Sequence, residues 1–215
     1  MRSLDLTLSP ALVPELSKGT WPLLANLSLN RPSTLSGELP AELDKHIFDG
    51  CKGKWPLLQR LAITLGKLSM AHIIALVEAE WTSLKTLRVE PLDSSLPDLM
   101  RGNWPQLKDL SLGVNVWHGG LEHLSACPWS TLERVELVRS RVDARGMASL
   151  FQANLPQLNE LLFVQVLLIN VRLEIQTKAC FSCLASGRWP LLAVLRLEVL
   201  DDRSKGLIVM RFLWM

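Results

Sequence analysis

One phrase, Trp-Pro-x-Leu-x-x-Leu-x-Leu, returns along this chain of 215 residues and constrains its fold more than any other feature. The first copy covers residues 21–29, and a partial copy precedes it at residues 4–8. Further copies, some with one or two positions replaced, cover residues 55–63, 81–89, 104–112, 129–137, 155–163 and 189–197. Such recurrence indicates a repeat protein, in which each unit packs mainly against its neighbours.

The spacing of the copies supports a stacked arrangement. The first Leu of each Leu-x-x-Leu-x-Leu serves as an anchor: Leu24, Leu58, Leu84, Leu107, Leu132, Leu158 and Leu192. Successive anchors lie 34, 26, 23, 25, 26 and 34 residues apart. We interpret the two long spacings as normal repeats that carry about ten extra residues.

Each copy alternates between apolar and polar positions. The second and third apolar positions are large in every copy: Leu27/Leu29, Leu61/Ile63, Leu87/Val89, Leu110/Leu112, Val135/Leu137, Leu161/Phe163 and Leu195/Leu197. Among the residues beside and between them, only Ala62, Leu162 and Val194 are apolar. Because successive side chains of a strand face opposite sides, this pattern predicts seven strands with one buried face.

The segments between these strands carry helical signals. Ser69 is expected to cap a helix whose Ile73, Leu76 and Val77 share one face. Residues 144–151 and 120–124 read as shorter helical turns. Proline disfavours the α conformation in the residue before it, so each Trp-Pro pair is expected to end a helical segment and start a strand. The Trp is expected to pack at the corner between helix and sheet.

These motifs resemble the leucine-rich-repeat superfamily over nearly the whole chain. The best match is Leu107 to Leu121, which includes Asn115, and a second runs from Leu132 to Leu150. The repeats resemble ribonuclease-inhibitor-like or F-box-associated types. The resemblance implies an α/β horseshoe solenoid with a parallel β-sheet on the concave face and helices on the convex face. In this family an Asn at one position of each repeat forms a ladder of hydrogen bonds between turns. Here Asn115 is the only clear copy, and the equivalent positions elsewhere are Pro32, Gly66, Leu92, Ser140, Val166 and Leu200.

We expect a single domain over residues 1–215, with about seven full repeats and a partial N-terminal one, incomplete at both ends. The chain starts within a strand pattern, and residues 206–215 form an apolar tail without a polar cap. Uncapped solenoid ends invite self-association. Residues 164–174 resemble additional strand where a loop and helix should begin.

Composition excludes several function classes. The formal net charge is +2, from 23 basic and 21 acidic residues, which argues against a dedicated nucleic-acid binder or a polybasic membrane anchor. The apolar run from Leu161 to Ile169 is too short to span a bilayer. The first residues lack the profile of a signal peptide. We therefore expect a cytoplasmic protein with reduced thiols.

The sequence contains no recognisable catalytic or metal-binding motif. Cys180 and Cys183 form a single C-x-x-C without a second pair or a His pair. His118, His123 and Cys127 are close in sequence, but no two are spaced to share a helical face. Nucleophile elbows, phosphate-binding glycine loops and paired carboxylates are missing. We expect a chain that is not an enzyme and that binds no cofactor or metal.

The concave face of the expected sheet is the candidate binding surface. Its charged residues, expected to project from the face, are Arg60, Arg88, Lys108, Asp109, Arg134, Glu136, Glu160 and Arg196. Solenoids bind extended partners on such surfaces. Because both signs are present, a protein partner suits the surface better than a polyanion.

We therefore expect a protein–protein interaction module, a scaffold that binds a protein on its concave face. One alternative is the substrate-recognition part of an F-box-type ubiquitin-ligase adaptor whose F-box is missing or lies on another stretch. Residues 39–43 faintly resemble the start of an F-box, but the three-helix module that should follow is absent. Another alternative is a GTPase-activator-like repeat protein, but the chain lacks the acidic tail that usually accompanies that type.

Overall fold

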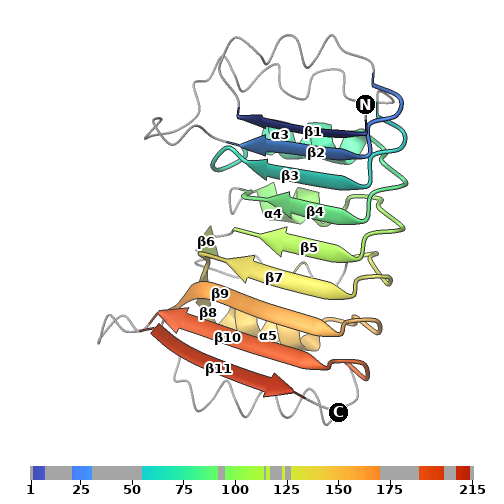
Figure 1. Cartoon of the computed structure of the whole chain (residues 1–215). Helices are drawn as coiled ribbons and strands as arrows, with labels where there is room; N and C mark the ends of the chain where they lie inside the picture. Colours follow the sequence, from blue (N-terminus) through green and yellow to red (C-terminus); the bar gives the residue numbers. More distant parts are fainter. Residues whose placement is uncertain are drawn as a thin grey trace. The chain divides into compact units, whose positions relative to one another are not determined.

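The structure, a computed structural model, describes residues 2–7, 21–30, 55–91, 95–113, 115–116, 123, 127–169, 189–200 and 207–213. The chain divides into two compact units, Met1–Leu107 and Lys108–Met215. Among the described residues, the first unit combines two helices and the second unit one helix with mainly parallel strands (Figure 1). The predicted α/β class with a parallel sheet is confirmed.

The first unit contains four parallel strands that pair in chain order: β1 (Ser3–Thr7), β2 (Asn26–Asn30), β3 (Arg60–Thr64) and β4 (Thr86–Val89). Two helices, α3 (Met70–Glu78) and α4 (Leu96–Leu99), lie on one side of this sheet (Figure 1). The opposite side of the strands carries no helix among the described residues of this unit.

The second unit contains a longer series of strands. Four are parallel and adjacent: β5 (Asp109–Leu112), β7 (Arg134–Val138), β9 (Glu160–Ile169) and β10 (Val194–Leu200). The last strand, β11 (Leu207–Leu213), pairs antiparallel with β10 along its whole length. Only six residues separate these two strands, too few for the crossover that a parallel pair requires. Part of the apolar tail therefore completes this end of the described sheet.

The predicted alternation of inward and outward side chains along each strand is confirmed in every copy. All fourteen apolar positions that were expected to face inward are buried. They lie in strands β2, β3, β4, β5, β7, β9 and β10. Most residues between them are half-buried or exposed, and the exception is Leu162, which is only 8% exposed. Each strand therefore has one face in the core and one face of mostly polar side chains.

A tight turn precedes each of these strands. The backbone N–H of the anchor Leu donates to the carbonyl three residues earlier, as from Leu24 to Trp21 at 3.0 Å. The same bond recurs for Leu58–Trp55, Leu84–Trp81, Leu107–Trp104, Leu132–Trp129, Leu158–Leu155 and Leu192–Trp189. Proline favours the second position of such turns because its φ is already fixed near the required value.

Each turn is also bonded to the turn before it. Gln59 and Arg60 both donate their backbone N–H groups to the carbonyl of Ala25, at 2.7 and 3.0 Å. In the second unit, Glu133 and Arg134 donate in the same way to the carbonyl of Lys108. This bifurcated bond repeats from turn to turn within each unit and sets the register of the strands that follow.

The tryptophans pack at these corners, as predicted. Trp55, Trp81, Trp104, Trp129 and Trp189 are buried, whereas Trp21 is half-buried. Trp55 stacks between Trp21 and Trp81, with ring centroids 6.3 and 5.8 Å apart and interplanar angles of 8° and 18°. In the second unit, the indole N–H of Trp189 donates to the carbonyl of Ala153 at 3.0 Å. The corner therefore joins consecutive repeats through aromatic packing as well as backbone bonds.

The helices largely follow the sequence signals. Ser69 is the N-cap of α3, and Ile73 and Leu76 are buried as expected. Val77 is only half-buried, and His72 is buried in addition. Burial of His72 is tolerated because its Nδ1 accepts a hydrogen bond from the backbone N–H of Ser69 at 3.1 Å.

The expected helical turn at residues 144–151 is helix α5 (Ala144–Gln152). The expected turn at residues 120–124 lies outside the described residues apart from His123.

The irregular segment after Phe163 is strand through Ile169, as its composition indicated. Residues 170–174 lie outside the described residues. Gln165 adopts a positive φ of 55°, and beyond it β9 pairs with a second short strand, β8 (Arg141–Asp143). Strand β8 also pairs with β6 (Asn115–Val116). The strands β6 and β8 and the end of β9 therefore form a second, shorter ladder of parallel pairs, which we call the secondary ladder.

Ser140 occupies one of the positions where the repeat motif would place Asn. Its hydroxyl is buried and donates to the carbonyls of Val138 and Leu112, at 3.1 and 3.4 Å. The bond to Leu112 crosses to the preceding strand. A smaller side chain therefore makes one of the inter-turn hydrogen bonds expected of the Asn ladder.

No helix among the described residues has both the length and the apolar composition needed to cross a membrane.

We predict that Trp81→Ala lowers the free energy of unfolding by about 3–5 kcal/mol, because it leaves a cavity at the corner and removes one partner of the Trp stack. Urea denaturation followed by circular dichroism measures this loss. Leu57→Ala is the matched control, since Leu57 lies in an equivalent turn but is 47% exposed, and it should change stability by less than about 0.5 kcal/mol. Equal effects of the two substitutions would contradict the corner-packing role.

Candidate functional site: the polar face of the strands

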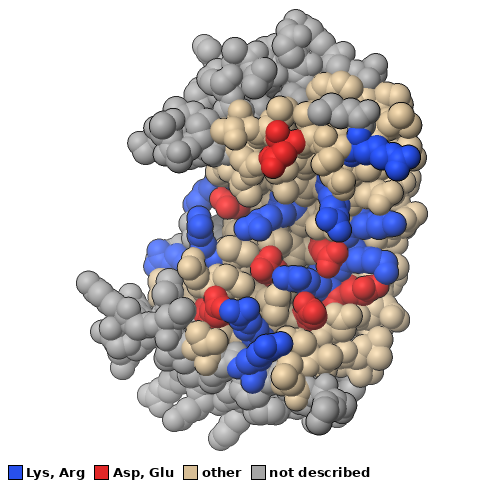
Figure 2. Space-filling view, in the orientation of Figure 1, with Lys and Arg blue, Asp and Glu red and all other residues tan. Residues whose placement is uncertain are grey.

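The outward side chains of the strands form one polar face in each unit, and we call these the strand faces. Figure 2 shows Lys and Arg intermixed with Asp and Glu over this side of the molecule. Neighbouring strands lie about 4.8 Å apart, so side chains at paired positions form rows across the sheet. The register of the strands therefore determines which charged groups meet.

In the first unit, one row joins Asp5, Ser28, Ala62 and Arg88 from strands β1 to β4. The next row along the strands contains Thr7, Asn30 and Thr64. Asn30 connects the two rows, because its Nδ2 donates to Asp5 Oδ1 at 2.6 Å and to Ser28 Oγ at 3.0 Å. The hydroxyl of Thr64 donates to Asn30 Oδ1 at 2.8 Å. The carboxylate of Asp5 is thus held within a polar network.

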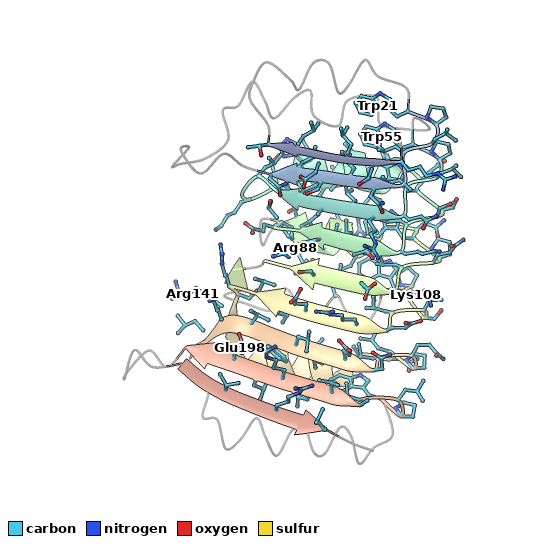
Figure 3. The ribbon with its side chains drawn as sticks, viewed as in Figure 1. Trp21, Trp55, Arg88, Lys108, Arg141 and Glu198 are labelled. Atoms are coloured by element: carbon cyan, nitrogen blue, oxygen red, sulfur yellow. The ribbon has the colours of Figure 1, made fainter. Side chains whose placement is uncertain are left out.

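The two arginines of this face have no such partner. Arg60 begins β3 and Arg88 lies within β4, and both side chains are exposed. Figure 3 shows Arg88 at the strand face. Within the described residues, neither guanidinium forms an ion pair or a hydrogen bond. They are cationic groups available to a binding partner.

The second unit arranges its charges differently. Asp109, Arg134 and Glu160 share one row, and Ser111, Glu136, Leu162 and Arg196 share the next. Arg134 lies between two carboxylates, with its Nη2 3.7 Å from Glu136 Oε1 and its Nε 3.6 Å from Glu160 Oε2. Arg196 forms an ion pair with Glu198 on the same strand. The charges of this face largely neutralise each other.

Lys108 lies in the turn before β5, at the edge where that strand begins (Figure 3). Its ammonium group is 2.5 Å from Glu133 Oε1. The hydrogen bond and the charge of Glu133 raise the pKa of Lys108 above its ordinary value of 10.5. Lys108 is therefore an edge residue of the second unit, bonded to the equivalent position of the next repeat.

Apolar side chains interrupt the charges of the second face. Leu162 is almost fully buried, and Val138, Val164 and Val194 are half-buried. They lie beside the ion pairs of Arg134 and Arg196. This combination offers both apolar contact and charge, which is typical of protein-binding surfaces.

The sequence predicted eight charged residues on this surface; the structure places seven of them on the strand faces and Lys108 at an edge, and several of their partners were missed. Glu133 was missed, although it follows its anchor Leu by one residue as Lys108 does. Glu198 was missed because it lies beyond the repeated phrase. The Asp5–Asn30–Thr64 network was missed because the surface was predicted from charged residues, and Asn30 and Thr64 are uncharged. Aligning the repeats by position would have found Glu133.

Among the described residues, no three His, Cys, Asp or Glu side chains are grouped to hold a metal ion. Burial raises the pKa of the Cys127 thiol, which disfavours the reactive thiolate. Cys180, Cys183 and His118 lie outside the described residues, as do residues 39–43, the segment that resembles an F-box start. The described chemistry is that of a surface for polar and ionic contact.

A comparison of the sequence with protein-family models gave no match, and neither did a comparison with curated proteins.

We predict a weak coupling between Arg134 and Glu160, because both side chains are about 40% exposed and water screens their attraction. A double-mutant cycle with Arg134→Ala and Glu160→Ala should give less than about 1 kcal/mol. The coupling should fall further in about 1 M salt, where the screening length is about 3 Å. A coupling of several kcal/mol that salt does not change would show that this pair is a structural element.

Proposed function

We propose that this chain is a leucine-rich-repeat-type solenoid protein that binds a protein partner on its strand faces. The repeated phrase, the parallel strands in each unit and the helices on one side of the sheet in the first unit support the repeat type. The departure at the Asn position is consistent with this proposal, since Ser140 makes an equivalent inter-turn bond.

The observation that carries the proposal is the regular presentation of polar side chains on the strand faces. The backbone groups of each strand are bonded to neighbouring strands and turns, so the side chains of the outer face remain for contact with a partner. Successive rows lie two residues, or about 7 Å, apart along the strands, which matches the spacing of same-face side chains in an extended polypeptide.

The charge pattern favours a protein over a nucleic acid as the partner. Nucleic-acid binders neutralise many phosphates with a basic surface. In the second unit, the arginines of the face are already paired with Glu136, Glu160 and Glu198, and apolar side chains lie beside them. A surface with both charges and apolar contacts suits the mixed composition of a protein surface.

Affinity capture with the purified full chain as bait tests this proposal. We expect wild-type protein to recover a set of partners that is reduced at least tenfold with the triple variant Arg60→Glu, Arg88→Glu and Arg134→Glu. The matched control, Lys67→Glu, Arg101→Glu and Arg139→Glu, reverses three exposed charges that lie outside the strands and should retain the partners.

Circular dichroism and thermal unfolding establish that both variants fold. Equal recovery of the same partners by the folded face variant and the wild type would overturn the proposal.

A further inference from the structure

We propose that the strand face of the first unit binds acidic side chains of an extended peptide segment, with Arg60 and Arg88 as the principal contacts. This inference rests on the proposed protein-binding function and specifies the chemistry of one part of the partner.

The register places the two arginines diagonally on adjacent strands. Arg60 pairs with Thr86, and Arg88 pairs with Ala62, so each arginine lies beside a small side chain. A lateral step of about 4.8 Å and two residues along a strand separate their backbone positions by about 8 Å. Because Ala62 and Thr86 are short, both guanidinium groups have open space above the sheet.

Among the described residues, these arginines have no carboxylate partner, in contrast to Arg134 and Arg196 on the strand face of the second unit. Glu90 directly follows β4 and forms no ion pair with Arg88 within the described residues. Asp5 belongs to the same row as Arg88 but lies three strands away and is bonded to Asn30. Lys85 is exposed in the turn before β4 and precedes Thr86, which pairs with Arg60, so a third cation lies at this edge of the first unit.

This arrangement fits carboxylates on alternate residues of an extended peptide. Guanidinium groups bind carboxylates with two parallel hydrogen bonds, which makes each contact directional. In an extended chain, alternate side chains share a face and lie about 7 Å apart, close to the separation of the two arginines. The half-buried amide side chain of Asn26, on the same face, can bond to the peptide backbone.

The flanking carboxylates limit the length of the anionic segment. Asp5 lies across the sheet in the same row as Arg88, and Glu90 lies two residues beyond Arg88 along the chain. A continuous polyanion such as single-stranded nucleic acid would extend over these groups and be repelled. A short acidic cluster within an otherwise neutral peptide avoids this repulsion.

Fluorescence anisotropy with defined probes tests the inference on the full chain. The probe is a labelled twelve-residue Gly/Ser peptide that carries three Glu residues at alternate positions, and the same peptide with Gln is the neutral control. We expect the acidic peptide to bind wild type at least tenfold more tightly than the Gln peptide, and the double variant Arg60→Gln, Arg88→Gln to lose at least tenfold in affinity.

The double variant Lys67→Gln, Arg101→Gln removes the same net charge from outside the strands and should bind within twofold of wild type. Equal loss in both double variants would mean attraction by net charge alone and would overturn the proposal. Tighter binding of a labelled oligothymidine of twelve nucleotides, lost in Arg60→Gln, Arg88→Gln, would also overturn it in favour of nucleic acid.

The failure of this inference is distinguishable from the failure of the proposed function. If the acidic peptide does not bind but affinity capture still depends on the charge-reversed face, the partner contacts the face by other chemistry. If neither result is obtained, the protein-binding function itself fails.

Discussion

The bifurcated bond between successive turns is the constraint on which the rest of the structure depends. Two adjacent N–H groups of each turn donate to one carbonyl of the turn before, as Gln59 and Arg60 do to Ala25. This bond fixes where each strand starts relative to its neighbour. Because a shift of one residue would turn every side chain to the other face, the same bond decides which residues are buried and which form the strand face.

The tryptophan corners make this arrangement of turns stable without an extensive Asn ladder. A tryptophan fills the space behind six of the seven turns, Leu155 takes its place in the other, and Trp55 stacks against the corner on either side of it. The stack also lowers stability in one respect, because the indole N–H groups of Trp55 and Trp81 are buried without an acceptor among the described residues. Trp189 avoids this cost by bonding to Ala153 at the end of α5. Aromatic contact adds about 0.5–1.5 kcal/mol per pair to the burial of the rings, which helps to offset the unsatisfied donors.

The strands and the buried face could be predicted from the sequence because the alternation is local and repeats in one register. Residues 24–29 and their equivalents all show the same alternation of apolar and polar side chains. The strand can therefore be predicted even in a copy where one position deviates from the pattern. The secondary ladder of β6 and β8 could not be predicted, since it depends on the bend at Gln165 and on pairing between distant segments. The ion pair of Lys108 with Glu133 joins equivalent positions of two consecutive repeats. It could not be predicted from either repeat alone. The antiparallel direction of β11 was missed although its cause, a six-residue connection, is visible in the sequence.

The two strand faces share one scaffold but differ in electrostatic character. In the second unit, acidic and basic residues alternate across the rows, so Arg134 meets carboxylates on its own strand and on the next. In the first unit, the neighbours of Arg60 and Arg88 across the row are Thr86 and Ala62, which supply no charge. Under the proposed function, a partner of the second face competes with existing ion pairs and makes apolar contact with half-buried residues such as Val194. A partner of the first face supplies the counter-charge of Arg60 and Arg88 itself, so we expect its binding to be the more sensitive of the two to salt. The two faces therefore differ in the kind of contact that they offer, although both arise from the same repeated strand.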